Sequence, residues 1–140
     1  MIVDSDAFVA LLHGADVHGQ DAEAILTTLI ARKTRFLYPA TVITETATLV
    51  QRRLKLPEIA AQIVQMVHTQ RLLITPVTHE TITAALAYYQ PTKSSTHHTL
   101  FDAVVAATAK QYQADAIFSF DGWYTSLGFT LAGDFVVQVA

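Results

Sequence analysis

The segment Met1-Ile2-Val3-Asp4-Ser5-Asp6-Ala7-Phe8-Val9-Ala10-Leu11-Leu12 decides the fold class, because it joins a short apolar run to an acidic residue and then to a helical stretch. A run this short, and apolar at every position, is typical of a strand that is buried on both faces. We expect a strand in each of the four later runs of the same character, which are Phe36-Leu37-Tyr38, Leu72-Leu73-Ile74, Ala116-Ile117-Phe118 and Phe135-Val136-Val137.

Amphipathic helical patterns fill the intervals between these runs. Apolar side chains recur at helical spacing over residues 22–30, 59–67 and 82–89, and further helices are expected over 99–113 and from Pro39-Ala40-Thr41 as far as Arg53. Strands and helices in alternation indicate βαβ units. The sequence therefore predicts an α/β fold, with a central parallel sheet and helices on both faces, in one domain over residues 1–140.

The composition narrows the class of protein. Of the 140 residues, 51% are hydrophobic and only 15% are charged, which excludes a disordered tail and a charge-rich coiled coil. So apolar a chain is expected to place some of its surface against a partner, which favours an oligomer. The net charge of −3 means that any binding of a polynucleotide must come from a local basic patch or from metal ions. The absence of cysteine excludes disulfides, thiolate zinc sites and cysteine nucleophiles.

The sequence shows neither a signal peptide nor a membrane span. The N-terminus has no basic region and carries an acid at position 4. Its longest uncharged apolar runs fall well short of the ~20 residues that a transmembrane helix needs. We therefore expect a soluble cytoplasmic protein.

Four acidic residues occupy related places in the predicted fold. Asp4 ends the first strand and Asp121 follows the fourth, while Glu45 and Asp102 lie in the first turns of two helices. In a parallel α/β sheet, the carboxyl ends of the strands and the N-termini of the crossover helices share one rim, where ligands bind. We expect these four carboxylates to meet there, with Asp6 as a possible fifth.

Each of these acids, taken alone, is also explained as a helix cap, since acids near helix N-termini satisfy free N–H groups and the macrodipole. Together they repel one another unless a cation lies between them. Carboxylate oxygens suit Mg²⁺ or Mn²⁺, and such ions on a phosphodiester activate water and stabilise the leaving oxygen. Position alone also fits a simple metal-binding site or a phosphoacceptor.

The residues around these acids resemble the motifs of PIN-domain proteins. Ile2-Val3-Asp4-Ser5-Asp6 resembles the opening strand and its Asp, and Thr44-Glu45-Thr46-Ala47-Thr48-Leu49-Val50-Gln51-Arg52-Arg53 resembles the second motif, a Glu followed by apolar positions and a basic pair. Phe101-Asp102-Ala103-Val104-Val105-Ala106-Ala107-Thr108-Ala109 is the most specific match, and Ala116-Ile117-Phe118-Ser119-Phe120-Asp121 resembles the strand that ends in a hydroxyl residue and a last Asp. The motifs come in the family's order and span nearly the whole chain.

This resemblance implies a three-layer PIN-like fold and a Mg²⁺- or Mn²⁺-dependent ribonuclease of the VapC toxin type, half of a bacterial toxin–antitoxin pair. By motif match, Asp4, Glu45, Asp102 and Asp121 would be the catalytic, metal-binding acids. Such proteins are usually homodimers and are silenced by an antitoxin whose tail enters the active-site groove. The implied partners are therefore RNA, a cognate antitoxin and a second copy of the chain.

The sequence departs from the family pattern without losing an acid. Asp6 stands where Ser or Asn is common and is a candidate fifth metal ligand, and Ser119 replaces a frequent Thr but keeps the hydroxyl. The last acid is followed by Gly122-Trp123-Tyr124 in place of a charged residue and Phe.

Residues beside the acids are candidates for contact with RNA, namely Ser5, Arg52, Arg53 and Ser119. The arginine pair is equally explained as a helix end whose cations suit the dipole. His97 and His98 either contact RNA or assist proton transfer, but an exposed loop pair without a role is the favoured interpretation. Trp123 and Tyr124 are expected to pack in the core or a dimer contact rather than to stack on bases.

Three other classes of protein compete with a nuclease. A phosphoacceptor module would need a lysine at the end of a late strand, whereas the last lysine, Lys110, is inside a predicted helix. A nucleotide-binding domain would need a glycine-rich phosphate loop, and the five glycines form none. A non-catalytic PIN-like module that binds RNA or protein would tolerate loss of an acid, and it remains the main alternative.

Overall fold

The computed structural model describes residues 1–92 and 97–140 and builds them around a four-stranded parallel sheet. The strands are β1 (Ile2–Val3), β2 (Leu37–Pro39), β3 (Leu73–Thr75) and β4 (Ile117–Phe118), in the order β3-β2-β1-β4. Ile2 is in register with Leu37 on one side and with Ile117 on the other. The chain thus moves outward from β1 to β3 and then returns to the far side of β1, so the strand order reverses between β1 and β4.

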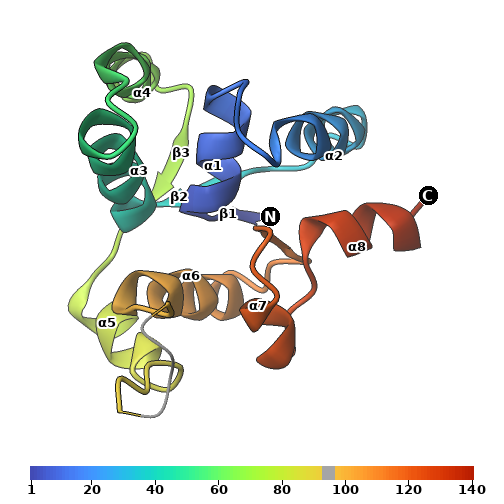
Figure 1. Ribbon diagram of the computed structural model, residues 1–140. Coiled ribbons are helices and arrows are strands. Elements are labelled where there is room, and N and C mark those ends of the chain that lie inside the picture. The colour runs from blue at the N-terminus through green and yellow to red at the C-terminus, as the bar shows by residue number, and fades with distance from the viewer. Residues whose placement is uncertain (93–96) are drawn as a thin grey trace.

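Helices cover both faces of this sheet (Figure 1). On one side lie α1 (Ser5–Leu12), α2 (Gly19–Ala31), α3 (Ala40–Arg52) and α4 (Pro57–His68). On the other lie α5 (His79–Ala85), α6 (Leu100–Gln111) and α7 (Trp123–Ser126), while α8 (Ala132–Gln138) packs against α2 and β4. The predicted three-layer α/β fold with a parallel sheet is confirmed.

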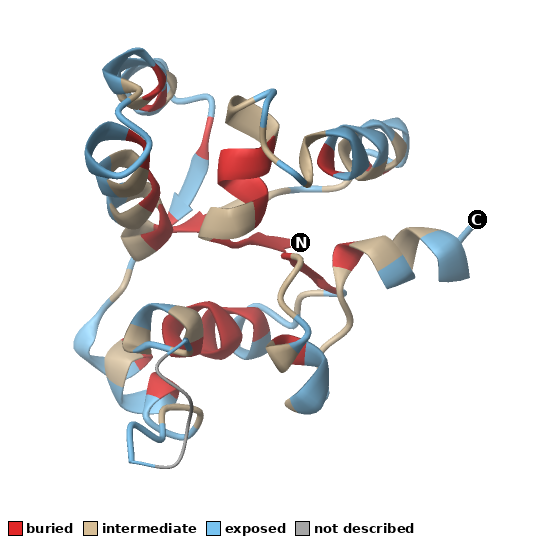
Figure 2. Ribbon diagram, in the orientation of Figure 1, coloured by how far each residue is buried: buried red, intermediate tan, exposed pale blue. Residues whose placement is uncertain are grey.

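The core runs through the centre of the sheet and into α1 and α6 (Figure 2). The side chains of β1 and β4 are completely buried, and α6 is buried continuously from Ala103 to Ala109. Those seven residues are alanine, valine and one threonine, and their small side chains let the helix lie close to the sheet. The helix α6 therefore packs closely against β1 and β2.

The prediction of a strand at Phe135-Val136-Val137 is wrong, because these residues belong to α8. The backbone N–H of Phe135 bonds to the carbonyl of Leu131, 2.9 Å away, which starts a helix instead of a ladder. Phe135 and Val136 pack on the core while Val137 is 75% exposed. A run of three apolar residues fits one face of a helix as well as it fits a strand, so its period does not decide between them.

Two further expectations need correction. Leu73 and Ile74 are exposed, so β3 is not buried on both faces, whereas β4 at the other edge of the sheet is completely buried. The helix expected over 82–89 ends at Ala85 as α5. The other expected strands and helices form, and α6 begins one residue after the predicted start. Among the residues that the structure describes, no helix has the length and apolar character needed to cross a membrane.

Candidate active site at the switch point of the sheet

Asp4 lies at the carboxyl end of β1, directly beside β4, where its backbone N–H bonds to the carbonyl of Phe118 at 3.0 Å. The side chain is only 4% exposed. Its Oδ1 accepts a bond from the backbone N–H of Ser5 (2.7 Å), which caps α1, and its Oδ2 accepts one from the hydroxyl of Tyr124 (2.8 Å). Burial, and next the charge of Asp6, raise the pKa of Asp4 well above its usual range despite these two hydrogen bonds.

Asp6 ties the first turn of α1 to the loop after β4. Its Oδ2 accepts hydrogen bonds from the Ser119 hydroxyl (2.9 Å) and from the backbone N–H of Phe120 (2.8 Å), and its Oδ1 accepts one from the N–H of Ala7 (2.6 Å). Burial raises the pKa of Asp6, and the charge of Asp121 adds to this effect. Both oxygens of this carboxylate are therefore already engaged by protein groups.

Glu45 reaches the site from the middle of α3. The buried stripe of that helix consists of Val42, Thr46 and Val50, and Glu45 lies at its border. Burial raises the pKa of Glu45, and the charges of Asp102 and Asp6 raise it further, while an interaction with the Ser5 hydroxyl opposes them. Its Oε2 is buried and has no hydrogen-bond partner among the described groups. A buried carboxylate oxygen without a partner is costly, so this atom is suited to a ligand.

Asp102 lies in the first turn of α6 and also caps it. Its Oδ2 accepts hydrogen bonds from the backbone N–H of Thr99 (2.6 Å) and from the Thr99 hydroxyl (3.2 Å). Burial raises the pKa of Asp102 despite these bonds, and the charge of Asp121 acts in the same direction. The interpretation of this acid as a helix cap is therefore correct, and it coexists with a place in the carboxylate cluster.

Asp121 follows β4 in a tight loop. Its own N–H bonds to the Ser119 hydroxyl (3.1 Å), and its Oδ1 accepts the backbone N–H of Trp123 (2.8 Å). Its Oδ2 lies 3.2 Å from Nε2 of His98, and the side chain is 39% exposed. Asp121 is thus partly open to solvent, unlike the buried Asp4.

The five acids form one electrostatic cluster. The charges of Asp6 and Asp102 raise the pKa values of Asp4 and Glu45. The charge of Asp121 raises the pKa values of Asp6 and Asp102. Hard oxygen donors, mutual repulsion and the unpartnered Oε2 of Glu45 together fit a small divalent cation. Within the described ranges, no three His, Cys, Asp or Glu side chains are already arranged as metal ligands.

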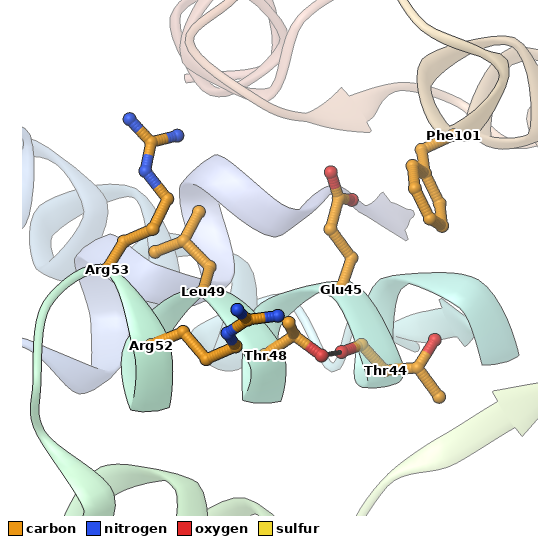
Figure 3. A pocket seen from close by; sticks show the side chains of 7 residues that line it. All are labelled: Thr44, Glu45, Thr48, Leu49, Arg52, Arg53 and Phe101. Atoms are coloured by element: carbon orange, nitrogen blue, oxygen red, sulfur yellow. Dashed lines mark hydrogen bonds between the residues drawn. The ribbon is translucent and has the colours of Figure 1, made fainter.

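A pocket of about 690 Å³ opens beside Glu45 (Figure 3). Its floor is α3, from which Glu45 projects upward, and Phe101 faces Glu45 from the start of α6. Arg53 projects at the far end of the helix, and Arg52 also lines the cavity. The pocket therefore has a cationic end, a carboxylate at its middle and an aromatic wall.

The candidate RNA contacts lie at two places in this site. Arg52 and Arg53 line the pocket together with Glu45. Ser5 interacts with Glu45, whereas Ser119 donates its hydroxyl hydrogen to Asp6 inside the cluster. Ser119 is 3% exposed, so its hydroxyl takes part in the hydrogen bonds of the carboxylate cluster and does not face the pocket.

Sequence reasoning missed three residues of the site. Tyr124 packs in the core as expected, and its hydroxyl also bonds to Asp4. The signal for this bond was that a buried tyrosine hydroxyl usually has a hydrogen-bond partner. His98 is partly buried and contacts Asp121, which contradicts its interpretation as an exposed loop residue without a role. Phe101 lines the pocket as an exposed aromatic residue. The available signal was its position directly before Asp102 in the sequence.

Comparison with known proteins identifies a family and several solved structures of similar fold. The family model described as PIN domain matches residues 1–127. The crystal structure of the Mycobacterium tuberculosis toxin VapC20, described as cleaving the sarcin-ricin loop, superposes with a TM-score of 0.77 at 21% identity, over 92% of this chain and 95% of that chain. Comparison with curated protein sequences finds no match. At this level of identity, the likeness to the toxin is a likeness of fold.

Proposed function

This chain belongs to the PIN-domain family, and we propose that it is a metal-dependent ribonuclease that acts as the toxin of a toxin–antitoxin pair. The observation that carries the proposal is the carboxylate cluster: acids from four separate segments lie at the switch point of the sheet, where burial and neighbouring carboxylates raise the pKa values of Asp4, Glu45 and Asp102. The fold likeness to an RNA-cleaving toxin supports RNA as the substrate and an antitoxin as a partner.

In this proposal Asp4, Glu45, Asp102 and Asp121 hold Mg²⁺ or Mn²⁺. When bound, such an ion supplies the positive charge that activates water and stabilises the leaving oxygen of a phosphodiester. The protein keeps these acids in place: Tyr124 and Ser5 orient Asp4, and Thr99 orients Asp102. Asp6 is a candidate fifth ligand by sequence; since it accepts hydrogen bonds from the Ser119 hydroxyl and the Phe120 N–H, we assign it the role of fixing the loop that presents Asp121.

The RNA strand would lie along the pocket on α3. Arg52 and Arg53 supply a local positive field that a chain of net charge −3 otherwise lacks, and they suit phosphates on one side of the cleaved bond. Phe101 offers a ring face to a base on the other side. The pocket thus explains how an acidic site accepts an anionic polymer.

We further propose a homodimer in the cytoplasm. Exposed apolar side chains on the edge strand and on α4 support a self-association surface, namely Leu73, Ile74, Val64 and Val67.

The experiment that tests the function is cleavage of a mixed RNA pool by purified protein with Mn²⁺, with Mg²⁺ and with EDTA. Asp102→Asn removes a cluster acid, and Asp134→Asn, an exposed acid on α8 outside the site, is the matched control. We expect metal-dependent cleavage by the wild type and by Asp134→Asn, and its loss in Asp102→Asn. Cleavage that persists in EDTA or in Asp102→Asn contradicts the proposal, and RNA binding without cleavage identifies a non-catalytic module.

A further inference from the structure

We propose that His98 is a positioning residue, which holds the Asp121 carboxylate in the orientation that metal binding needs. This role rests on the proposed function. The carboxylate is held at both oxygens: Oδ1 by the backbone N–H of Trp123 at 2.8 Å, and Oδ2 by Nε2 of His98 at 3.2 Å. Of the two contacts, only the one from His98 depends on a side chain. An imidazole nitrogen is a donor in the charged ring and in one neutral tautomer, so the contact does not require a particular charge state.

The imidazole is itself fixed in direction by an aromatic neighbour. Its ring stacks on the indole of Trp123 with centroids 4.7 Å apart and planes 13° from parallel. Trp123 in turn packs against the ring of Tyr124 at 5.3 Å in an edge-on arrangement. Tyr124 bonds to Asp4, so an aromatic series connects the acid at the end of β1 with the acid that follows β4. Stacked and edge-on aromatic contacts restrict ring orientation, and therefore restrict where Nε2 points.

The segment before α6 orients two acids of the cluster at once. His98 contacts Asp121, and the next residue, Thr99, bonds to Asp102 through its N–H and its hydroxyl. These two acids approach closely enough for Asp121 to raise the pKa of Asp102. Residues 98 and 99 thus set the spacing between a carboxylate on α6 and one on the β4–α7 loop.

Asp121 has more need of such support than the buried Asp4. Its side chain is 39% exposed, whereas Asp4 is 4% exposed and enclosed by the core. A solvent-exposed carboxylate loses rotamer freedom when it binds a cation, and a neighbour that holds it beforehand lowers that entropic cost. Loss of an outer partner of a ligand typically reduces metal affinity about 10- to 100-fold.

The alternative role for His98 is a platform for a nucleotide base. One face of the imidazole lies on Trp123, so a base would have to stack on the opposite face. In that role His98 would contribute to RNA affinity and not to metal affinity. Measuring metal binding in the absence of RNA separates the two roles.

The test compares His98→Ala and His98→Gln with His68→Ala, which removes an exposed histidine at the end of α4. Mn²⁺ affinity is measured without RNA by calorimetry or by the electron paramagnetic resonance of free Mn²⁺. Tb³⁺ titration adds a spectroscopic readout, since the single tryptophan, Trp123, is two residues from Asp121 and can sensitise a bound lanthanide. Thermal unfolding in EDTA shows whether each variant is folded.

We expect His98→Ala to bind Mn²⁺ and Tb³⁺ about 10- to 100-fold more weakly, with an unchanged KM for RNA at saturating Mn²⁺. His98→Gln, which keeps a nitrogen donor, should recover much of the affinity, and His68→Ala should match the wild type. Wild-type Mn²⁺ affinity in His98→Ala would overturn this role, and so would a raised KM for RNA with unaltered Mn²⁺ affinity. A wild-type protein that binds no Mn²⁺ would instead overturn the proposed function itself.

Discussion

The hydroxyl of Tyr124 donates a 2.8 Å hydrogen bond to the buried carboxylate of Asp4, which lies 120 positions earlier in the chain. Both side chains are almost completely enclosed, at 0% and 4% exposure. The bond therefore connects the first strand of the sheet with the helix that follows the last strand, at the deepest point of the carboxylate cluster.

Removal of this hydroxyl in Tyr124→Phe should destabilise the protein at neutral pH. The substitution keeps the ring in the core but leaves Oδ2 of Asp4 without its donor, and a buried acceptor without a partner costs about 1–3 kcal/mol. Urea unfolding of the metal-free protein measures the change, with Tyr112→Phe, an exposed tyrosine at the end of α6, as control. Equal stability of the two variants would show that this bond contributes nothing.

Stability of the metal-free protein should fall as the pH rises above about 4, the ordinary carboxyl pKa. The pKa values of Asp4, Asp6, Glu45 and Asp102 are raised in the folded state, so the folded chain binds protons more tightly than the unfolded chain does. The stabilisation from these protons is complete below the carboxyl pKa of the unfolded chain. It is lost as the pH rises through the higher pKa values of the folded protein. Thermal unfolding in EDTA between pH 4.5 and pH 8 checks this.

Binding of a divalent ion should restore the stability that the metal-free protein loses as the pH rises. Added Mg²⁺ or Mn²⁺ compensates the ionised carboxylates, so it should raise the melting temperature more at pH 7.5 than at pH 5, where protons compete for the same oxygens. Asp102→Asn should reduce this increment, and Asp134→Asn should leave it intact. An increment that is independent of pH would argue against binding at the cluster.

Loss of the arginine pair should weaken RNA binding and reduce its dependence on salt. In single-stranded nucleic acid each phosphate contact contributes about 0.7 to the slope of log affinity against log salt concentration. Arg52→Gln and Arg53→Gln should each lower the slope by up to that amount and raise KM, with kcat little changed at saturating RNA. Arg71→Gln removes an equal charge from an exposed position outside the pocket and should have no effect.

Phe101 should contribute to RNA affinity by stacking on one base of the substrate. Stacking of a base on an aromatic side chain is worth about 1–3 kcal/mol, so Phe101→Ala should raise KM by about 5- to 150-fold and Phe101→Tyr should not. Tyr112→Ala, at the other end of the same helix, is the control. With a substrate that carries an abasic nucleotide at the contacted position, wild type and Phe101→Ala should become alike; a variant that stays impaired on every abasic substrate refutes stacking.

The fold could be predicted from the sequence because its strands are short, apolar and separated by clear helical patterns. The failures have physical causes. Phe135-Val136-Val137 is too short for its period to decide between strand and helix, and only the packing of α8 against α2 and β4 settles it. The exposure of Leu73 and Ile74 depends on how far other elements cover β3, and the local sequence does not show this, since the equally apolar edge strand β4 is completely buried.

The convergence of the acids could also be predicted, since topology places strand ends and helix starts at one rim. The side chains that contact these acids could not be predicted. Whether Asp6 bonds to Ser119, or His98 contacts Asp121, depends on loop geometry over separations of 113 and 23 residues. Neither a helical nor a strand period describes such contacts, and a polar side chain in a loop has the same local pattern whether it faces water or a carboxylate.

The bonds from Ser119 and Phe120 to Asp6 have a consequence for when the site forms during synthesis. The segment with Asp4 and Asp6 is translated more than a hundred residues before the groups at 119–124 that bond to its carboxylates. Until those residues have been made, the two carboxylates have only the local bonds from the N–H groups of Ser5 and Ala7. The proposed active site is therefore completed only after residues 119–124 have been synthesised, and a shorter nascent chain lacks both these bonds and Asp121.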